Sequence, residues 1–186
     1  DVLLKGPTIT KGYYHRDAAN KDAFTEDGFF RTGDAGYIKD GELFLTDRIK
    51  DLFKTSNGKY IAPQLVESLI LVDKYIDQVA VIANERKFVS ALIVPEFRLV
   101  EDWAKEHGIE FSSREDLCAN PKVNKMILDR IKTLQQQLAH YEQVKRITLI
   151  PHHFSLESGE LTNTLKIRRP VVYKNYKNEI DKMYEE

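Results

Sequence analysis

Two apolar runs rich in β-branched residues constrain the fold of this chain most strongly. They are Val79–Ala83 and Val89–Val94, and the charged segment Asn84–Lys87 separates them. Runs of this kind joined by a short polar turn predict a β-hairpin. The class of the fold then depends on what flanks the hairpin in the sequence.

Helical patterns surround this hairpin. Pro63 suits the first turn of a helix, because its missing N–H would have no partner there. The other predicted elements are identified by apolar spacing, capping residues and stop signals. They are a helix over 97–107, a helix from Asn120-Pro121 to Tyr141, a strand over 147–150, and one last helix from Pro170 that carries Val172, Tyr176, Ile180 and Tyr184. Strands interleaved with helices predict an α+β or α/β domain with a short central sheet flanked by helices.

Residues 1–47 show a different pattern, of short strands and turns. Asp40-Gly41 lies between two apolar segments, and an Asp-Gly pair favours the positive φ of a tight hairpin turn. Asn57-Gly58 predicts a second hairpin for the same reason. A β-rich segment therefore precedes the mixed domain.

Composition excludes several classes of protein. The chain has 186 residues, 28 Lys and Arg, 29 Asp and Glu, and a net charge of −1, which disfavours a dedicated nucleic-acid binder. Its 42% hydrophobic residues are enough for a core. A single cysteine, Cys118, fits a reducing, cytoplasmic location. No apolar run approaches the roughly 18 residues of a membrane-spanning helix.

The first candidate site is the segment Phe30–Asp34, which contains Thr-Gly-Asp. Such a segment between strands is commonly a simple turn. An ionised Asp34, however, carries only acceptor oxygens, and held beside a glycine it can accept both hydroxyls of a ribose.

The second candidate is the charged segment 47–54 with the loop that follows it. A solvated junction between two elements is the simpler reading. In a functional reading, the guanidinium of Arg48 offers five N–H donors that could bind a ribose or a phosphate. Lys50 and Asp51 would be exposed pivot residues between domains.

The third candidate is Glu160–Arg169, a Thr-rich segment with basic residues that leads into the last predicted helix. Such a segment is usually solvated surface. A lysine on a polar loop can also meet a carboxylate and a phosphate together and stabilise the charge that develops during attack.

Metal and thiol chemistry have little support. His152 and His153 are neighbours, so on an extended chain they point to opposite faces and cannot chelate one ion. Cys118 has no visible activating partner. No Walker or Rossmann phosphate loop is present. We therefore expect no metal ligands in this chain.

Together and in this order, the three segments resemble the C-terminal portion of the acyl-adenylate-forming enzymes, and most of all the long-chain fatty acid–CoA ligases. The resemblance covers nearly the whole chain. The matching segments are Leu4–Pro7 with Lys11–Tyr14, the segment Asp27–Asp34, the hinge and loop Asp47–Pro63, and Leu161–Arg169, where Asn163 replaces the usual proline.

The resemblance implies ATP and coenzyme A as substrates. A fatty acid carboxylate would attack the α-phosphate of ATP, and coenzyme A would then displace AMP from the acyl-AMP. By position, Asp34 and Arg48 would bind the nucleotide ribose, and Lys166 would be the adenylation lysine. Lys50 with Asp51 would form the hinge, and a loop of Asn57, Gly58 and Lys59 would border the coenzyme A channel. The parent enzyme would also need magnesium.

The resemblance further implies a domain organisation. Residues 1–49 would be the β-rich edge of a large N-terminal domain, and residues 50–186 the small lid domain, with the hinge near Lys50. The phosphate loop, the adenine-stacking aromatic residue and the fatty-acid tunnel of the family have no match here. We therefore expect a fragment, inactive by itself, of a parent that could associate peripherally with membranes, while the oligomeric state stays open.

Two alternatives remain at this stage. One is a ligase for another carboxylic acid, or one that delivers acyl groups to a carrier protein, since chain length would be set by the missing tunnel. The other, of a different class, is a non-catalytic interaction module that keeps the fold. Loss of Lys166 or Asp34 would be its signature, and both are present.

Overall fold

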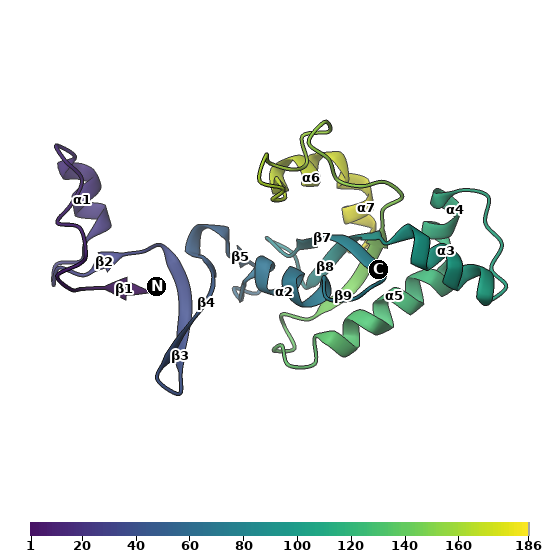
Figure 1. Ribbon diagram of the computed structural model, residues 1–186, viewed down its shortest axis with the longest axis horizontal. Helices are drawn as coiled ribbons and strands as arrows, with labels where there is room; N and C mark the ends of the chain where they lie inside the picture. The colour runs from purple at the N-terminus through teal and green to yellow at the C-terminus, as the bar shows by residue number, and fades with distance from the viewer. Residues whose placement is uncertain (186) are drawn as a thin grey trace. The chain divides into compact units, whose positions relative to one another are not determined.

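The computed structural model describes residues 1–185 and divides the chain into two compact units, Asp1–Leu52 and Phe53–Glu186. Each unit is described by itself, in chain order along the colour bar of Figure 1. The domain boundary expected between residues 49 and 50 stays a prediction.

The first unit consists of short, paired elements. They are β1 (Leu3–Leu4), α1 (Asp17–Ala23), β2 (Phe30–Arg31), β3 (Asp34–Lys39), β4 (Glu42–Arg48) and the 3-10 turn η1 (Ile49–Asp51). β1 pairs with β2 and β3 with β4, both antiparallel. Asp40 (φ 51°) and Gly41 (φ 84°) form the predicted tight turn between β3 and β4.

Helix α1 was not predicted from the sequence, which indicated only strands and turns before residue 48. Three alanines and an acidic first residue favour a helix locally, but a helix of seven residues is marginal in isolation. Asn20 ties it to the preceding loop: its side-chain oxygen accepts from Tyr13 N at 2.7 Å and its Nδ2 donates to Tyr13 O at 3.0 Å. A contact outside the helix therefore stabilises it.

None of residues 1–52 is buried. The β3–β4 hairpin instead exposes large apolar side chains, with Ile38 76% and Leu45 63% accessible. Tyr37 and Phe44 stack on each other, with ring centroids 5.3 Å apart. A small unit that buries so little apolar surface has few internal contacts to stabilise it.

The second unit is the mixed α and β domain that the sequence predicted (Figure 1). Its elements are β5 (Phe53–Lys54), β6 (Tyr60–Ile61), α2 (Pro63–Ile70), β7 (Ile76–Ile82), β8 (Val89–Pro95), α3 (Phe97–Glu106), α4 (Arg114–Ala119), α5 (Pro121–Leu134), β9 (Val144–Leu149), α6 (Arg169–Asn175) and α7 (Lys177–Lys182). The sheet order is β7-β8-β9, with β7 and β8 antiparallel and β8 and β9 parallel. The predicted hairpin is therefore the centre of the domain.

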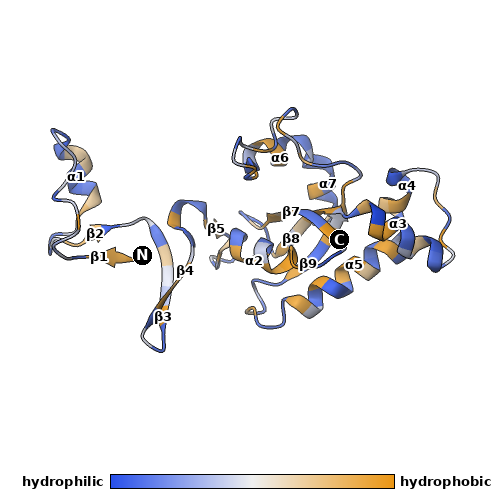
Figure 2. Cartoon of the chain, viewed as in Figure 1, coloured by the Kyte–Doolittle hydropathy of each residue, from blue (hydrophilic) through white to orange (hydrophobic). Residues whose placement is uncertain are grey.

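The core lies where helices cover this sheet. In Figure 1, α5 runs along one side of the sheet, and α6 and α7 lie on the other. Figure 2 shows hydrophobic and hydrophilic bands alternating along α5, as expected of a helix with one buried face. Fully buried side chains come from strands and helices alike; they include Val81, Leu92, Ile93, Val100, Val123, Ile127 and Ile131.

The long helix is shorter than predicted. α5 ends at Leu134, so Leu138 and Tyr141 lie beyond it despite their helical spacing. The buried Gln135 explains this end: its Oε1 accepts from Val144 N at 2.8 Å, and its Nε2 donates to Val144 O at 2.9 Å. The Gln135 side chain thus makes, at the first residue of β9, the two backbone hydrogen bonds that a paired strand would otherwise make.

The last helix is also not continuous. α6 and α7 meet at Tyr176, whose φ of −110° and ψ of 28° break the helix. Val172, Tyr176 and Ile180 are nevertheless all buried, as their spacing predicted. α4 was not predicted; Ser113 caps it by accepting from Asp116 N at 3.2 Å.

Within residues 1–185, no helix has both the length and the apolar character needed to cross a membrane.

Candidate functional site

Asp34 and Arg48, which the sequence singled out separately, form an ion pair. They are register partners on β3 and β4, and Arg48 Nε lies 3.1 Å from Asp34 Oδ1. Their side chains are 28% and 54% exposed, so the pair adds little to stability. The arrangement presents a carboxylate acceptor beside a guanidinium donor at the surface of the first unit.

Glycines shape this end of the hairpin. Gly33 has a φ of 75°, and its carbonyl accepts from Ile49 N at 2.9 Å. A bulge between Ala35 and Gly36 shifts the register of the two strands. A Cβ at Gly36 would lie 2.6 Å from the carbonyl oxygen of Phe44, so only glycine fits there. The bulge, which no sequence signal predicted, brings Asp34 opposite Arg48.

Lys50 and Asp51 belong to η1 at the end of the first unit. The turn contains the hydrogen bond Leu52 N to Ile49 O at 3.3 Å, and both flanking residues, Arg48 and Leu52, are extended. Lys50 is exposed and Asp51 is half-buried. A hinge at this turn stays a prediction.

The loop Asn57–Lys59 joins β5 to β6 and is closed by Thr55. Thr55 N donates to Lys59 O at 2.9 Å, and Lys59 N donates to Thr55 Oγ1 at 3.0 Å. Gly58 has a φ of 76°, and a Cβ there would meet no atom within 4 Å. The positive φ therefore explains why glycine occupies this position, and the space where a side chain would begin is open.

The same loop is attached to the turn between β7 and β8. Ser56 N donates to Arg86 O at 3.0 Å, and Glu85 N donates to Lys54 O at 2.8 Å. The ammonium of Lys59 lies 5.4 Å from the ring centroid of Tyr141. The Gly58 loop is thus held by the central hairpin of the second unit.

Lys166 lies on a small hairpin between β9 and α6. Thr162 N donates to Lys166 O at 2.8 Å, and Lys166 N donates to Thr162 Oγ1 at 3.1 Å. An antiparallel β-bridge joins Leu161 to Ile167, and Leu165, in the turn between them, has a φ of 59°. The Lys166 side chain is exposed. A short, hydrogen-bonded hairpin therefore carries Lys166 with its side chain exposed.

Two buried acidic residues anchor this hairpin, and the sequence did not predict this role for either of them. Glu160, 3% exposed, begins it and accepts from Asn175 Nδ2 at 3.0 Å. Just after it, Arg169 donates to Glu67 through Nη1 to Oε1 at 2.7 Å and Nη2 to Oε2 at 2.9 Å. One feature of the sequence could have indicated the burial of Glu67. Its position follows the helical spacing of the buried residues Pro63, Val66 and Ile70 of α2.

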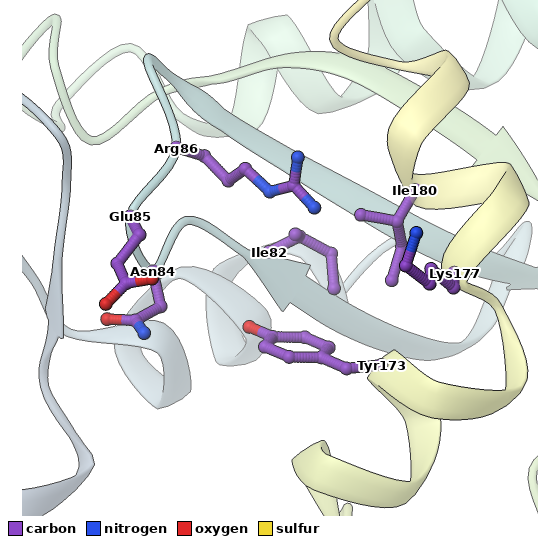
Figure 3. Close-up of a pocket in the computed structure, with 7 residues that line it drawn as sticks. All are labelled: Ile82, Asn84, Glu85, Arg86, Tyr173, Lys177 and Ile180. Carbon is purple, nitrogen blue, oxygen red and sulfur yellow. The ribbon is translucent and has the colours of Figure 1, made fainter.

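The structure also contains a pocket of about 410 Å³ between the β7–β8 turn and α6–α7 (Figure 3). Its lining residues are Ile82, Asn84, Glu85, Arg86, Tyr173, Lys177 and Ile180. The hydroxyl of Tyr173 is buried and has no hydrogen-bond partner among the described residues. Burial raises the pKa of this hydroxyl above its usual value, so it stays protonated at neutral pH.

Residues 1–185 contain no group of three or more His, Cys, Asp and Glu side chains placed to hold a metal ion. Cys118 is 6% exposed. Burial, with a smaller contribution from Glu115, raises the pKa of its thiol to about 12. The thiol is therefore protonated at neutral pH and packs as a small apolar group.

Comparison with known proteins identifies the family. The family model of the AMP-binding enzyme C-terminal domain matches residues 50–186. Long-chain-fatty-acid–CoA ligase 1 of Homo sapiens is 37% identical over 188 residues. Long chain acyl-CoA synthetase 7, peroxisomal, of Arabidopsis thaliana is 33% identical over 190 residues. The alignments cover 99% and 100% of this chain and 27% of each relative.

Solved structures agree with this fold. The adenylation domain of a carboxylate reductase from Mycobacterium chelonae aligns with a TM-score of 0.71 and 26% identity. The A domain of a carboxylic acid reductase from Segniliparus rugosus, in complex with AMP and a co-purified carboxylic acid, aligns with a TM-score of 0.70 and 25% identity. Each alignment covers 98% of this chain and 27% of the other.

The chain belongs to the family of AMP-binding enzyme C-terminal domains, within the acyl-adenylate-forming ligase superfamily. This confirms the resemblance and the fold class drawn from the sequence. The chain spans about a quarter of the length of the curated relatives that it matches.

Proposed function

We propose that this chain is the C-terminal part of an AMP-forming ligase that joins long-chain fatty acids to coenzyme A. The exposed Lys166 on its anchored hairpin carries the proposal, together with the similarity of the whole chain to long-chain fatty acid–CoA ligases. The activity belongs to a longer protein, because the relatives are nearly four times as long as the aligned segment.

In the first half-reaction, a carboxylate oxygen of the fatty acid attacks the α-phosphorus of ATP, and the bond to pyrophosphate breaks. The ammonium of Lys166 would neutralise charge on the carboxylate and phosphate as they meet. Asp34 would accept the ribose hydroxyls, while Arg48, 3.1 Å away, keeps its carboxylate oriented and contacts the same ribose.

In the second half-reaction, the sulfur of coenzyme A attacks the acyl carbon, the thiol proton leaves, and the bond to AMP breaks. The open space above Gly58 would admit the pantetheine arm. Each half-reaction needs different groups beside the acyl carbon, so rotation near Lys50 would exchange Lys166 for the Gly58 loop.

The remaining parts of the site would come from a large N-terminal domain of the same protein. The exposed apolar side chains of β3 and β4, such as Ile38 and Leu45, support this assignment, because they need a covering surface. Magnesium would serve the nucleotide phosphates in the parent enzyme. We assign its ligands to that domain, as the resemblance to the family implies.

The test uses the full-length enzyme that carries this segment, with Lys166→Ala and, as a control, Lys174→Ala, an exposed lysine on α6. We expect Lys166→Ala to lower ATP–pyrophosphate exchange with palmitate by about 100-fold or more. Thioester formation from supplied palmitoyl-AMP should persist, and Lys174→Ala should match the wild type. Unchanged exchange in Lys166→Ala would contradict the role of Lys166.

Acid specificity is tested in the same assay. We expect exchange with palmitate to exceed exchange with acetate or benzoate. Exchange that is highest with a short or aromatic acid would instead favour a ligase for another carboxylic acid. No exchange with any acid would favour an interaction module that keeps the fold.

A further inference from the structure

Glu160 occupies an unusual position, because a carboxylate is buried at the base of the hairpin that carries Lys166. Its side chain accepts from Ser158 Oγ at 2.7 Å and from Asn175 Nδ2 at 3.0 Å. Burial alone would raise the pKa of this carboxyl, but these hydrogen bonds outweigh it and the pKa is lowered. Glu160 is therefore an ionised acceptor surrounded by donors.

The main chain of Glu160 closes the hairpin. Its carbonyl accepts from Arg168 N at 2.7 Å, and two residues further along Thr162 N donates to Lys166 O at 2.8 Å. These bonds place Glu160 and Lys166 on the same short ladder. The carboxylate, in turn, ties that ladder to Asn175, the last residue of α6, next to the junction with α7.

We propose that Glu160 is a positioning residue, which holds the hairpin on the α6–α7 junction and thereby fixes where the Lys166 ammonium lies during adenylation. The inference rests on the proposed role of Lys166. Its physical basis is that an error of about 1 Å in the placement of a reacting group can cost up to about 100-fold in rate.

The test removes the charge and one of the two acceptor oxygens without changing the size of the side chain. In Glu160→Gln, the amide oxygen can still accept from one of Ser158 and Asn175, but an NH2 group faces the other. We expect the kcat of ATP–pyrophosphate exchange to fall about ten-fold, with little change in the KM for ATP. Thioester formation from supplied palmitoyl-AMP should not change. Hydrogen exchange should become faster in the peptide that covers residues 160–168.

Asn175 permits a rescue by reversed polarity. In the double variant Glu160→Gln with Asn175→Asp, the amide introduced at position 160 can donate to the carboxylate introduced at position 175, so we expect most of the lost kcat to return. Glu157→Gln, which changes an exposed glutamate in the same loop, is the matched control and should behave as the wild type. All variants are assayed in the full-length enzyme.

The outcomes separate this inference from the proposed function. Normal exchange in Glu160→Gln, while Lys166→Ala is impaired, would overturn the positioning role and leave the proposed function intact. An equal loss of both half-reactions in Glu160→Gln would also overturn it, since that result shows general destabilisation. Normal exchange in Lys166→Ala would refute the proposed function itself.

Discussion

Arg169 and Glu67 form a bidentate ion pair, in which Arg169 Nη1 lies 2.7 Å from Glu67 Oε1 and Arg169 Nη2 lies 2.9 Å from Glu67 Oε2. Only 18% of the arginine side chain and 11% of the glutamate side chain are exposed. Glu67 Oε1 also accepts from Val81 N at 2.9 Å, and the guanidinium lies 5.1 Å from the ring centroid of Phe53. The pair thus joins α2, β7 and the start of α6.

Removing one partner of this pair should destabilise the second unit. We expect Arg169→Leu to lower the free energy of unfolding by about 3 kcal/mol, because it leaves the Glu67 carboxylate buried without its cation. Urea unfolding measures the change. The neighbouring Arg168→Leu is the control, because Arg168 is exposed and should change stability by less than about 0.5 kcal/mol. Equal changes in the free energy of unfolding in both variants would show that the buried ion pair does not contribute to stability.

A hinge at η1 predicts that the two half-reactions respond differently to a stiffened backbone. In the full-length enzyme, Lys50→Pro should leave ATP–pyrophosphate exchange close to the wild type and reduce thioester formation, because proline fixes φ at the proposed pivot. Lys50→Ala, which keeps the backbone free, should preserve both. If Lys50→Pro lowers both half-reactions equally, the pivot lies elsewhere.

Tyr173 and Tyr184 offer a matched pair of buried hydroxyls. Tyr173 Oη has no partner among the described residues, whereas Tyr184 Oη bonds Ser90 Oγ at 2.7 Å and Phe88 O at 3.0 Å. Tyr173→Phe should therefore stabilise the fold by about 1 kcal/mol, and Tyr184→Phe should destabilise it by about 1 kcal/mol. Thermal or urea unfolding distinguishes the two. A loss of stability in Tyr173→Phe would show that a ligand or water satisfies that hydroxyl.

The raised pKa of Cys118 predicts a dependence of stability on alkaline pH. The folded thiol keeps its proton up to about pH 12, while the unfolded thiol loses its proton near its ordinary value of 9.0. The stabilising contribution is therefore complete below about pH 9 and is lost as the pH rises towards 12. Between pH 9 and 10.5, the free energy of unfolding should fall by about 1 kcal/mol per pH unit more than in Cys118→Val. Parallel pH profiles would contradict this.

Local signals predicted the elements whose determinants lie within a few residues. The Asp40-Gly41 turn and the helix start at Pro63 depend on backbone preferences of the residues themselves, and both were confirmed. The end of α5 and the break at Tyr176 were predicted wrongly. The first depends on Gln135 pairing with Val144, and the second lies next to Asn175, which binds the distant Glu160, so neither is visible in local spacing.

In the candidate site, too, some features were predictable from neighbouring residues and others depend on contacts between distant residues. Asp34, Arg48 and Lys166 were singled out because their residue types and neighbours suit nucleotide chemistry. Their roles stay predictions, but the ion pair between Asp34 and Arg48 is a structural fact. No individual role was predicted for Glu67, Glu160 or Arg169, although the last two bound the third candidate segment. Apart from the helical spacing of Glu67, nothing in the sequence around these residues indicates that they are buried.

The order of apolar runs, turns and helical patterns was enough to predict the fold class, since strand and helix periods are properties of neighbouring residues. The family was indicated by the resemblance of three short motifs to known enzymes, and the comparisons confirmed it. Folding in three dimensions established how the site segments are held. Glu160 meets Asn175, and Glu67 meets Arg169 across 102 positions, because packing brings distant residues together and a buried charge is stable only beside a partner.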